Sequence, residues 1–179
     1  GDNGETVEII DQTKLPFEFV IVGLNTLDDA AVAISDMLVR GAPLIGAMAA
    51  YGVALAMQEE PSDAGLDNAY KVLYATRPTA VNLRWALDDL KTLLGPLAPG
   101  HRRDAAYKRA AEICDEDVEM CSSLGKHGKL VIEDIWTAKN KSGGKPDRVN
   151  VLTHCNAGWL EIGRRRVGKE CKSRWAPHH

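Results

Sequence analysis

The stretch that most constrains the fold is VLTHCNAGWL at Val151–Leu160, near the C-terminal end of the 179 residues. Its apolar, β-branched start predicts a buried strand, and polar residues follow where that strand would end. Open α/β sheets bind ligands at this end of their strands. Such a strand needs partner strands and helices on both faces. Only residues 161–179 follow, and they do not resemble a sheet domain. We therefore expect an α/β domain that begins here and lacks its remaining strands.

The residues before this strand predict an α+β domain, a β-hairpin plus a helical bundle. Thr6–Ile10 and Phe17–Val22 are strand-like, with a loop between them. Helical periodicity and caps predict helices at Leu27–Val39, Leu44–Met57, Leu66–Ala75, Pro78–Leu94, His101–Leu124 and Lys126–Lys139, with Gly125 ending the fifth. Leu44–Met57 is apolar nearly all round and rich in small residues, so we expect it to be central and closely packed.

KSGGKPD at 141–147 has the composition of a linker and predicts a domain boundary. We expect an N-terminal domain at 1–145, the first strand of the second domain at 146–160, and a basic tail at 161–179. That tail carries six Lys/Arg and two Glu. The net charge of the whole chain is −3, so residues 1–160 carry a net charge of −7. An acidic body gives no reason to expect nucleic-acid binding. A basic tail could bind an anionic surface. The favoured interpretation is that residues 161–179 are foreign or frameshifted sequence.

Composition excludes some classes of protein and site. No apolar run is long enough to span a bilayer, so no membrane partner is expected. The four cysteines have no metal-ligand spacing, which favours reduced thiols in a cytoplasmic protein. Cys114 and Cys121 have the spacing of core residues on one helix. No metal or organic cofactor is implied, and Trp85, Trp136 and Trp159 are most simply packing residues.

Arg40-Gly41-Ala42-Pro43 joins two predicted helices. The start of the second helix offers backbone N–H groups and the positive end of a dipole, and Arg40 adds a bidentate donor. Together these groups suit a phosphate. Alternatively, Gly41 caps the preceding helix and Arg40 neutralises its carbonyl end. From the residues alone the capping interpretation is favoured.

Arg77-Pro78-Thr79 has the same design, because Pro78 pushes Arg77 out of helical geometry beside a helix start. The simpler interpretation is a solvated loop arginine, and for this site alone it is favoured. Two arginines beside two helix starts shift the balance toward an anionic ligand.

Cys155 follows the predicted strand and suits a nucleophile, an acid/base or a packed apolar group. Its neighbour His154 points to the opposite strand face, so the sequence does not imply an activated thiol. Asn156 and nearby backbone N–H groups could bind a ligand oxygen.

Several long segments together resemble the methylthioribose-1-phosphate isomerase family of methionine salvage. They are RGAPLIG at 40–46, TRPTAVNLRWAL at 76–87 and VLTHCNAGWL at 151–160, supported by IIDQTKLP at 9–16 and AAEICDEDVEMCSSLGKHG at 110–128. The wider family includes ribose-1,5-bisphosphate isomerase and regulatory subunits of the exchange factor for initiation factor two.

The resemblance implies conversion of the aldose 5-methylthioribose 1-phosphate to the ketose 5-methylthioribulose 1-phosphate. It implies that Arg40, Gly41, Ala42 and Arg77 bind this small-molecule substrate and that Cys155 is catalytic. It also implies that VLTHCNAGWL opens a Rossmann-like domain.

That family domain also supplies an aspartate general acid and further substrate contacts, for which 161–179 show no counterpart. We therefore expect a chain that is incomplete and inactive alone. The alternatives are a non-catalytic regulatory or binding module of the same family and a ribose-1,5-bisphosphate isomerase. A homodimer is implied mainly through segments without a counterpart here, so the oligomeric state stays open.

Overall fold

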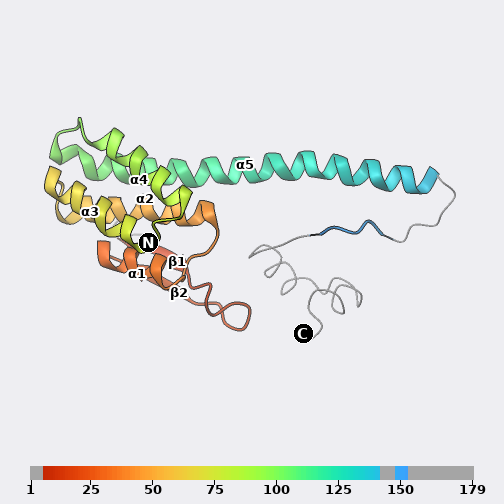
Figure 1. Cartoon of the computed structure of the whole chain (residues 1–179), viewed down its shortest axis with the longest axis horizontal. Coiled ribbons are helices and arrows are strands. Elements are labelled where there is room, and N and C mark those ends of the chain that lie inside the picture. Colours follow the sequence, from red (N-terminus) through yellow and green to blue (C-terminus); the bar gives the residue numbers. More distant parts are fainter. Residues whose placement is uncertain (1–5, 142–147, 153–179) are drawn as a thin grey trace.

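The computed structural model describes residues 6–141 and 148–152, which form a small hairpin and a helical bundle. The hairpin pairs β1 and β2 antiparallel, with Val7 opposite Leu24 and Ile10 opposite Ile21. Figure 1 shows the hairpin beside the bundle and the last helix projecting far beyond it. The predicted hairpin plus helical bundle is confirmed. The elements are β1 (Val7–Ile10), β2 (Ile21–Leu24), α1 (Leu27–Ser35), α2 (Ala42–Glu59), α3 (Asp63–Thr76), α4 (Val81–Leu94) and α5 (Pro99–Lys141).

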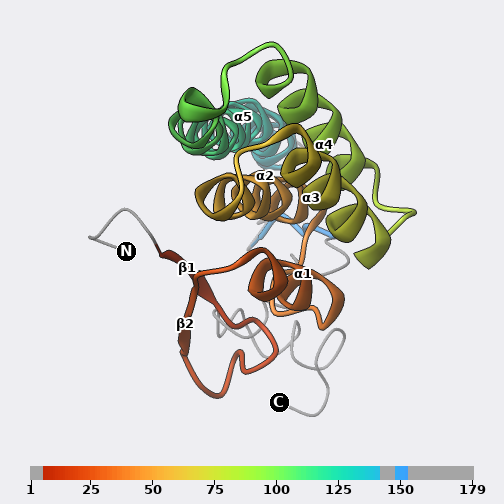
Figure 2. The ribbon, with the colours of Figure 1, turned by 90° about the vertical axis from the view of Figure 1, so that its left-hand side faces the viewer.

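Helix α2 is the centre of the bundle, as its sequence predicts. Every residue from Ile45 to Met57 is buried except the half-buried Tyr51. Figure 2 shows α2 lying among α1, α3, α4 and α5, all of which it contacts. A Cβ atom on Gly52 would lie within 3.1 Å of both Leu73 and Ala30. The small residues of α2 therefore let its neighbours approach closely, and apolar burial on all sides is the main source of stability.

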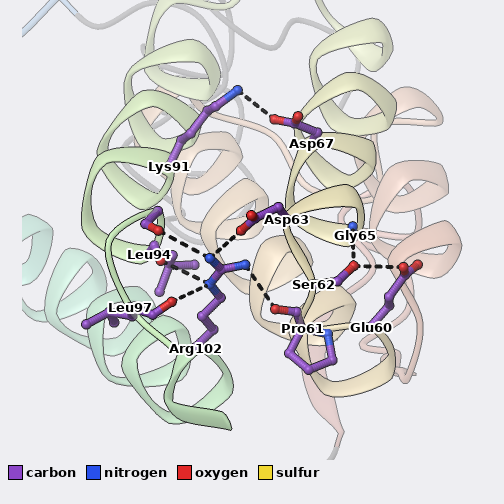
Figure 3. Close-up of polar contacts among 11 residues, drawn as sticks. Glu60, Pro61, Ser62, Asp63, Gly65, Asp67, Lys91, Leu94, Leu97 and Arg102 are labelled. Carbon is purple, nitrogen blue, oxygen red and sulfur yellow. Dashed lines mark hydrogen bonds and ion pairs between the residues drawn. The ribbon is translucent and has the colours of Figure 1, made fainter. Parts of the chain in front are cut away.

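A buried arginine joins three segments at one end of the bundle. Arg102 lies in the first turns of α5, and only 3% of its side chain is exposed. Its guanidinium reaches the loop between α2 and α3 and the carbonyl end of α4 (Figure 3). These carbonyls have no partner within a helix, so the arginine satisfies them. Its partners are the carbonyl oxygens of Leu94 (3.1 Å), Leu97 (3.0 Å), Pro61 (3.0 Å) and Gly95 (3.2 Å), and the Asp63 carboxylate.

Helix α1 starts as predicted and ends earlier. The capping box is present: Thr26 accepts from the Asp29 N–H, and the Asp29 carboxylate accepts from the Thr26 N–H. The helix ends at Ser35 rather than Val39, and Met37 takes the left-handed conformation at φ 60°. The prediction that Gly41 caps this helix is therefore wrong. Helix α4 begins at Val81 rather than at the predicted Pro78, because Pro78 and Thr79 form a turn.

The prediction that Gly125 ends a helix is also wrong, because α5 continues without a break to Lys141. A glycine inside a helix costs only about 1 kcal/mol relative to alanine. The residues on both sides of Gly125 favour helix enough to outweigh that cost. The same continuation exposes Cys121, which was predicted to be a core residue, and leaves Cys114 only half-buried.

Two further boundaries differ from prediction. The second strand begins at Ile21, and Phe17 and Phe19 lie exposed in the preceding connection. Val151 and Leu152, predicted to start a buried strand, are exposed and unpaired within the described residues. The Rossmann-like start is therefore not confirmed. The boundary region 142–147 and the tail lie outside the described residues, so the domain limits stay predictions.

Among residues 6–141 and 148–152, no helix combines the length and the apolar character that crossing a bilayer requires.

We predict that Arg102→Met lowers the free energy of unfolding by about 2–4 kcal/mol, because several carbonyl oxygens lose their hydrogen-bond donor. Urea unfolding followed by circular dichroism measures the change. Exposed Arg103 is the matched control, and Arg103→Met should change stability by less than about 0.5 kcal/mol. Equal effects of the two substitutions would contradict the role given to Arg102.

Candidate functional site

The start of α2 is an open positive helix end. Gly41 is its N-cap residue at φ 99° and ψ 132°, a backbone conformation that other residues rarely adopt. No side chain caps the helix, and its first turn holds no acidic residue. Arg40, Gly41 and Ala42 are all exposed. Backbone N–H groups and the helix dipole therefore face solvent beside a guanidinium group.

The loop after β1 holds the segment before α2 in place. The Gln12 N–H donates to the Leu38 carbonyl at 2.9 Å, and its side-chain amide donates to the Arg40 carbonyl at 3.5 Å. The loop is itself fixed by buried Asp11, whose carboxylate accepts from the Thr13 N–H (2.9 Å) and hydroxyl (2.6 Å). The hydrogen bond from the Thr13 hydroxyl is the main cause that lowers the pKa of Asp11. This loop thus fixes the backbone that carries Arg40.

Arg77 occupies the corresponding place before α4. It is the C-cap residue of α3, and its backbone (φ −150°, ψ 76°) is outside the helical region that the following proline disfavours. Its carbonyl accepts from the Ala80 N–H at 3.0 Å, which closes the turn into α4. Ala80 provides no side-chain cap, and the first turn of α4 has no acidic residue. Arg77 therefore lies three residues before Ala80, the N-cap residue of α4, whereas the sequence predicted that this helix begins at Pro78.

The starts of α2 and α4 lie against each other. A Cβ atom on Gly46 would lie 3.0 Å from the Asn82 carbonyl oxygen, and Asn82 is in the first turn of α4. Glycine is needed here because the two backbones approach so closely. The contact brings two uncapped helix starts together, with Arg40 before one and Arg77 before the other.

Neither guanidinium group is engaged within the part of the chain that the structure describes. Arg40 and Arg77 take part there in no side-chain hydrogen bond or ion pair, whereas Arg102 and Arg109 are paired with carboxylates. Arg40 is exposed and Arg77 half-buried. Among the described residues, these two cations and the two positive helix ends leave an excess of positive charge, which an anion would neutralise.

The structure thus places four of the five predicted site residues, and it replaces the capping interpretation of Arg40. Helix α1 ends five residues before Arg40, so this arginine does not neutralise its carbonyl end. Cys155 lies outside the described residues, and its role stays a prediction. Sequence reasoning assigned no role to Gln12 or Asn82, although both lie in segments that carry the family resemblance. Within 6–141 and 148–152, no group of three or more His, Cys, Asp or Glu residues could hold a metal ion.

Comparison with known proteins places the chain in a family. The profile of the "Initiation factor 2 subunit family" matches residues 38–170, more than half of the chain. The chain belongs to this family. The matched region includes the starts of both α2 and α4, so the candidate site lies within the part that family members share.

Close relatives within this family carry the name methylthioribose-1-phosphate isomerase. The protein of that name from Paramagnetospirillum magneticum is 60% identical over 158 residues, which are 88% of this chain and 42% of the relative. The one from Escherichia coli is 54% identical over 88% of this chain and 42% of the relative. The chain therefore spans about two fifths of the isomerases it matches.

Solved structures of the family have the same fold. The 5-methylthioribose 1-phosphate isomerase of Pyrococcus horikoshii superposes with a TM-score of 0.66 at 37% identity, over 72% of this chain and 38% of that one. The delta subunit of translation initiation factor eIF-2B from A. fulgidus gives 0.59 at 32% identity, over 64% and 37%. Most of this chain's fold thus occurs both in a protein named as an isomerase and in a translation-factor subunit.

We predict that Gly46→Val lowers the free energy of unfolding by about 2–3 kcal/mol, because its side chain would push α4 away from α2. Thermal unfolding measures the change. Gly100, in the first turn of α5, is the control: its Cβ position is open, so Gly100→Val should be nearly neutral. A Gly46→Val protein as stable as the control would show that the two helix starts do not need this close contact.

Proposed function

We propose that this protein binds 5-methylthioribose 1-phosphate and serves its isomerisation to 5-methylthioribulose 1-phosphate in methionine salvage. The observation that carries the proposal is a pair of arginines beside two uncapped helix starts, neither of which has a side-chain partner among the described residues. Relatives at 54–60% identity that share this region are named methylthioribose-1-phosphate isomerase, which supports the same substrate. The use of free thiols, at Cys114 and Cys121, fits a cytoplasmic enzyme.

The phosphate is the part of the substrate that the described residues suit. Its charge of nearly −2 would face the Gly41 and Ala42 backbone at the positive end of α2. Arg40 and Arg77 would each donate charge-assisted hydrogen bonds to its oxygens. Such bonds contribute about 1.5–3 kcal/mol each. The Gln12 loop would keep the Arg40 backbone in place, so the ligand need not order it.

The isomerisation step also requires acid and base groups outside this phosphate site. An aldose and its ketose are isomers, so the net reaction moves hydrogen between two neighbouring carbons and consumes no oxidant. Groups that carry protons must stand beside those carbons. We propose Cys155 as a catalytic residue at that position. Binding and turnover are therefore separate measurements, since the arginines serve the first and Cys155 the second.

We predict that calorimetric titration of the chain with 5-methylthioribose 1-phosphate shows binding that Arg40→Ala and Arg77→Ala each weaken about 10- to 100-fold. Lysine at either position should recover part of the affinity, because it restores the charge but not the bidentate fork. Arg103→Ala, which removes an exposed arginine of α5, should leave the affinity unchanged.

Binding that is insensitive to both arginine substitutions would refute this phosphate site. Turnover is measured separately as ketose formation. Cys155→Ala should abolish any turnover and leave binding of the sugar phosphate within about threefold, because the thiol is not assigned to the phosphate.

A non-catalytic regulatory module is the second candidate, and the structural likeness to the eIF-2B delta subunit favours it. In that case the chain should show no affinity for the sugar phosphate. Ribose 1,5-bisphosphate is the third ligand to titrate. A second phosphate would require a further basic site, so preference for this ligand over the methylthio sugar would redirect the assignment to a bisphosphate isomerase.

A further inference from the structure

The side-chain amide of Asn82 makes no hydrogen bond to any other described residue. Asn82 is the second residue of α4 and is half-buried. It does not cap its helix, whose N-cap residue is Ala80. Asparagine is a poor helix former and is favoured at caps and turns, because its amide competes for backbone groups. Helix formation or capping therefore does not explain an asparagine at this position.

The Asn82 amide is open to solvent. Among the described residues that are not exposed, every side-chain nitrogen or oxygen that is fully buried has a hydrogen-bond partner. The amide of half-buried Asn82 has no such partner, so its polar atoms are not sealed inside the bundle. A ligand at the helix starts can therefore reach this amide.

Asn82 lies close to the backbone that forms the proposed phosphate site. A Cβ atom on Gly46 would lie 3.4 Å from the Asn82 Cβ atom. Gly46 is four residues after Ala42, so the two share a face of α2 and are about 6 Å apart along its axis. Figure 2 shows α4 running beside α2. Asn82 is therefore about one helical turn from the free N–H groups of α2, a separation that suits the sugar rather than its phosphate.

The chemistry of the amide also suits a sugar hydroxyl. A neutral amide carries two N–H donors and one acceptor oxygen, and a hydroxyl group likewise donates and accepts. A phosphate dianion only accepts, so the amide oxygen would face its negative charge. Arg40 and Arg77 carry donors only, and they suit the phosphate. The three side chains thus divide between the two parts of a sugar phosphate.

We propose that Asn82 binds the sugar hydroxyl on the carbon next to the one that carries the phosphate. This hydroxyl is the one nearest to the phosphate on the ring, and Asn82 is one turn from the phosphate site. The assignment rests on the phosphate site of the proposed function. Asn82 then determines specificity for hydroxylated over deoxy sugar phosphates, because an analogue without this hydroxyl leaves the amide unpaired beside the bound ligand.

Two ligands that differ only in this hydroxyl test the assignment. Calorimetric titration of the full chain should show that ribose 1-phosphate binds about 5- to 10-fold more tightly than 2-deoxyribose 1-phosphate. In Asn82→Leu, which is similar in size and has no amide, the two ligands should bind within about twofold of each other. Arg40→Ala should weaken both ligands and leave their ratio unchanged, because it acts on the phosphate.

Asn68→Leu, at an exposed asparagine of α3, is the matched control and should keep the preference of the parent. Circular dichroism checks that each variant is folded, and the nearly isosteric Asn82→Asp replaces Asn82→Leu if that variant unfolds. A parent without preference, or a preference that survives the loss of the amide, would overturn the role of Asn82 alone. Binding that does not depend on Arg40 and Arg77, or no binding of either ligand, would overturn the proposed phosphate site as well.

Discussion

The bundle depends on one buried cation that binds the ends of three segments. Arg102 satisfies carbonyl oxygens at the end of α4 and in the loop before α3, while its own charge meets the Asp63 carboxylate. A buried guanidinium without these partners would be strongly destabilising. The interaction therefore fixes where α5 begins relative to α2, α3 and α4. Apolar packing around α2 supplies most of the stability, but the arginine fixes the relative positions of the helix ends.

Helix packing also places the functional groups. Gly46 lets the start of α4 approach the start of α2, and Gly41 turns the chain so that α2 begins immediately after Arg40. The two positive helix ends then lie side by side, and the Gln12 loop holds one of them from the hairpin side. This arrangement belongs to a fold found in both isomerase and translation-factor relatives. What distinguishes those functions must therefore lie in the ligand groups around the shared scaffold.

The length of α5 gives the molecule two different surfaces. Its first part completes the core through Ala106 and Ala110, and its second part carries the same apolar face into solvent. A break at Gly125 would have let the last segment fold back on the bundle. An unbroken helix instead extends this apolar face beyond the bundle. Within the described residues, the bundle does not cover that face.

The sequence by itself determined the local features: the Thr26–Asp29 capping box, the hairpin, the burial of α2 and the non-helical Arg77 before proline. Each depends on nearby residues or on side-chain polarity alone. Only the tertiary structure decided that α1 stops at Ser35, that α5 passes through Gly125, and that Arg40 and Arg77 flank neighbouring helix starts. These outcomes depend on contacts between segments far apart in the chain, such as Gly46 with Asn82 and Arg102 with Pro61. Local propensities differ by only about 1 kcal/mol per residue, so packing between distant segments outweighs them.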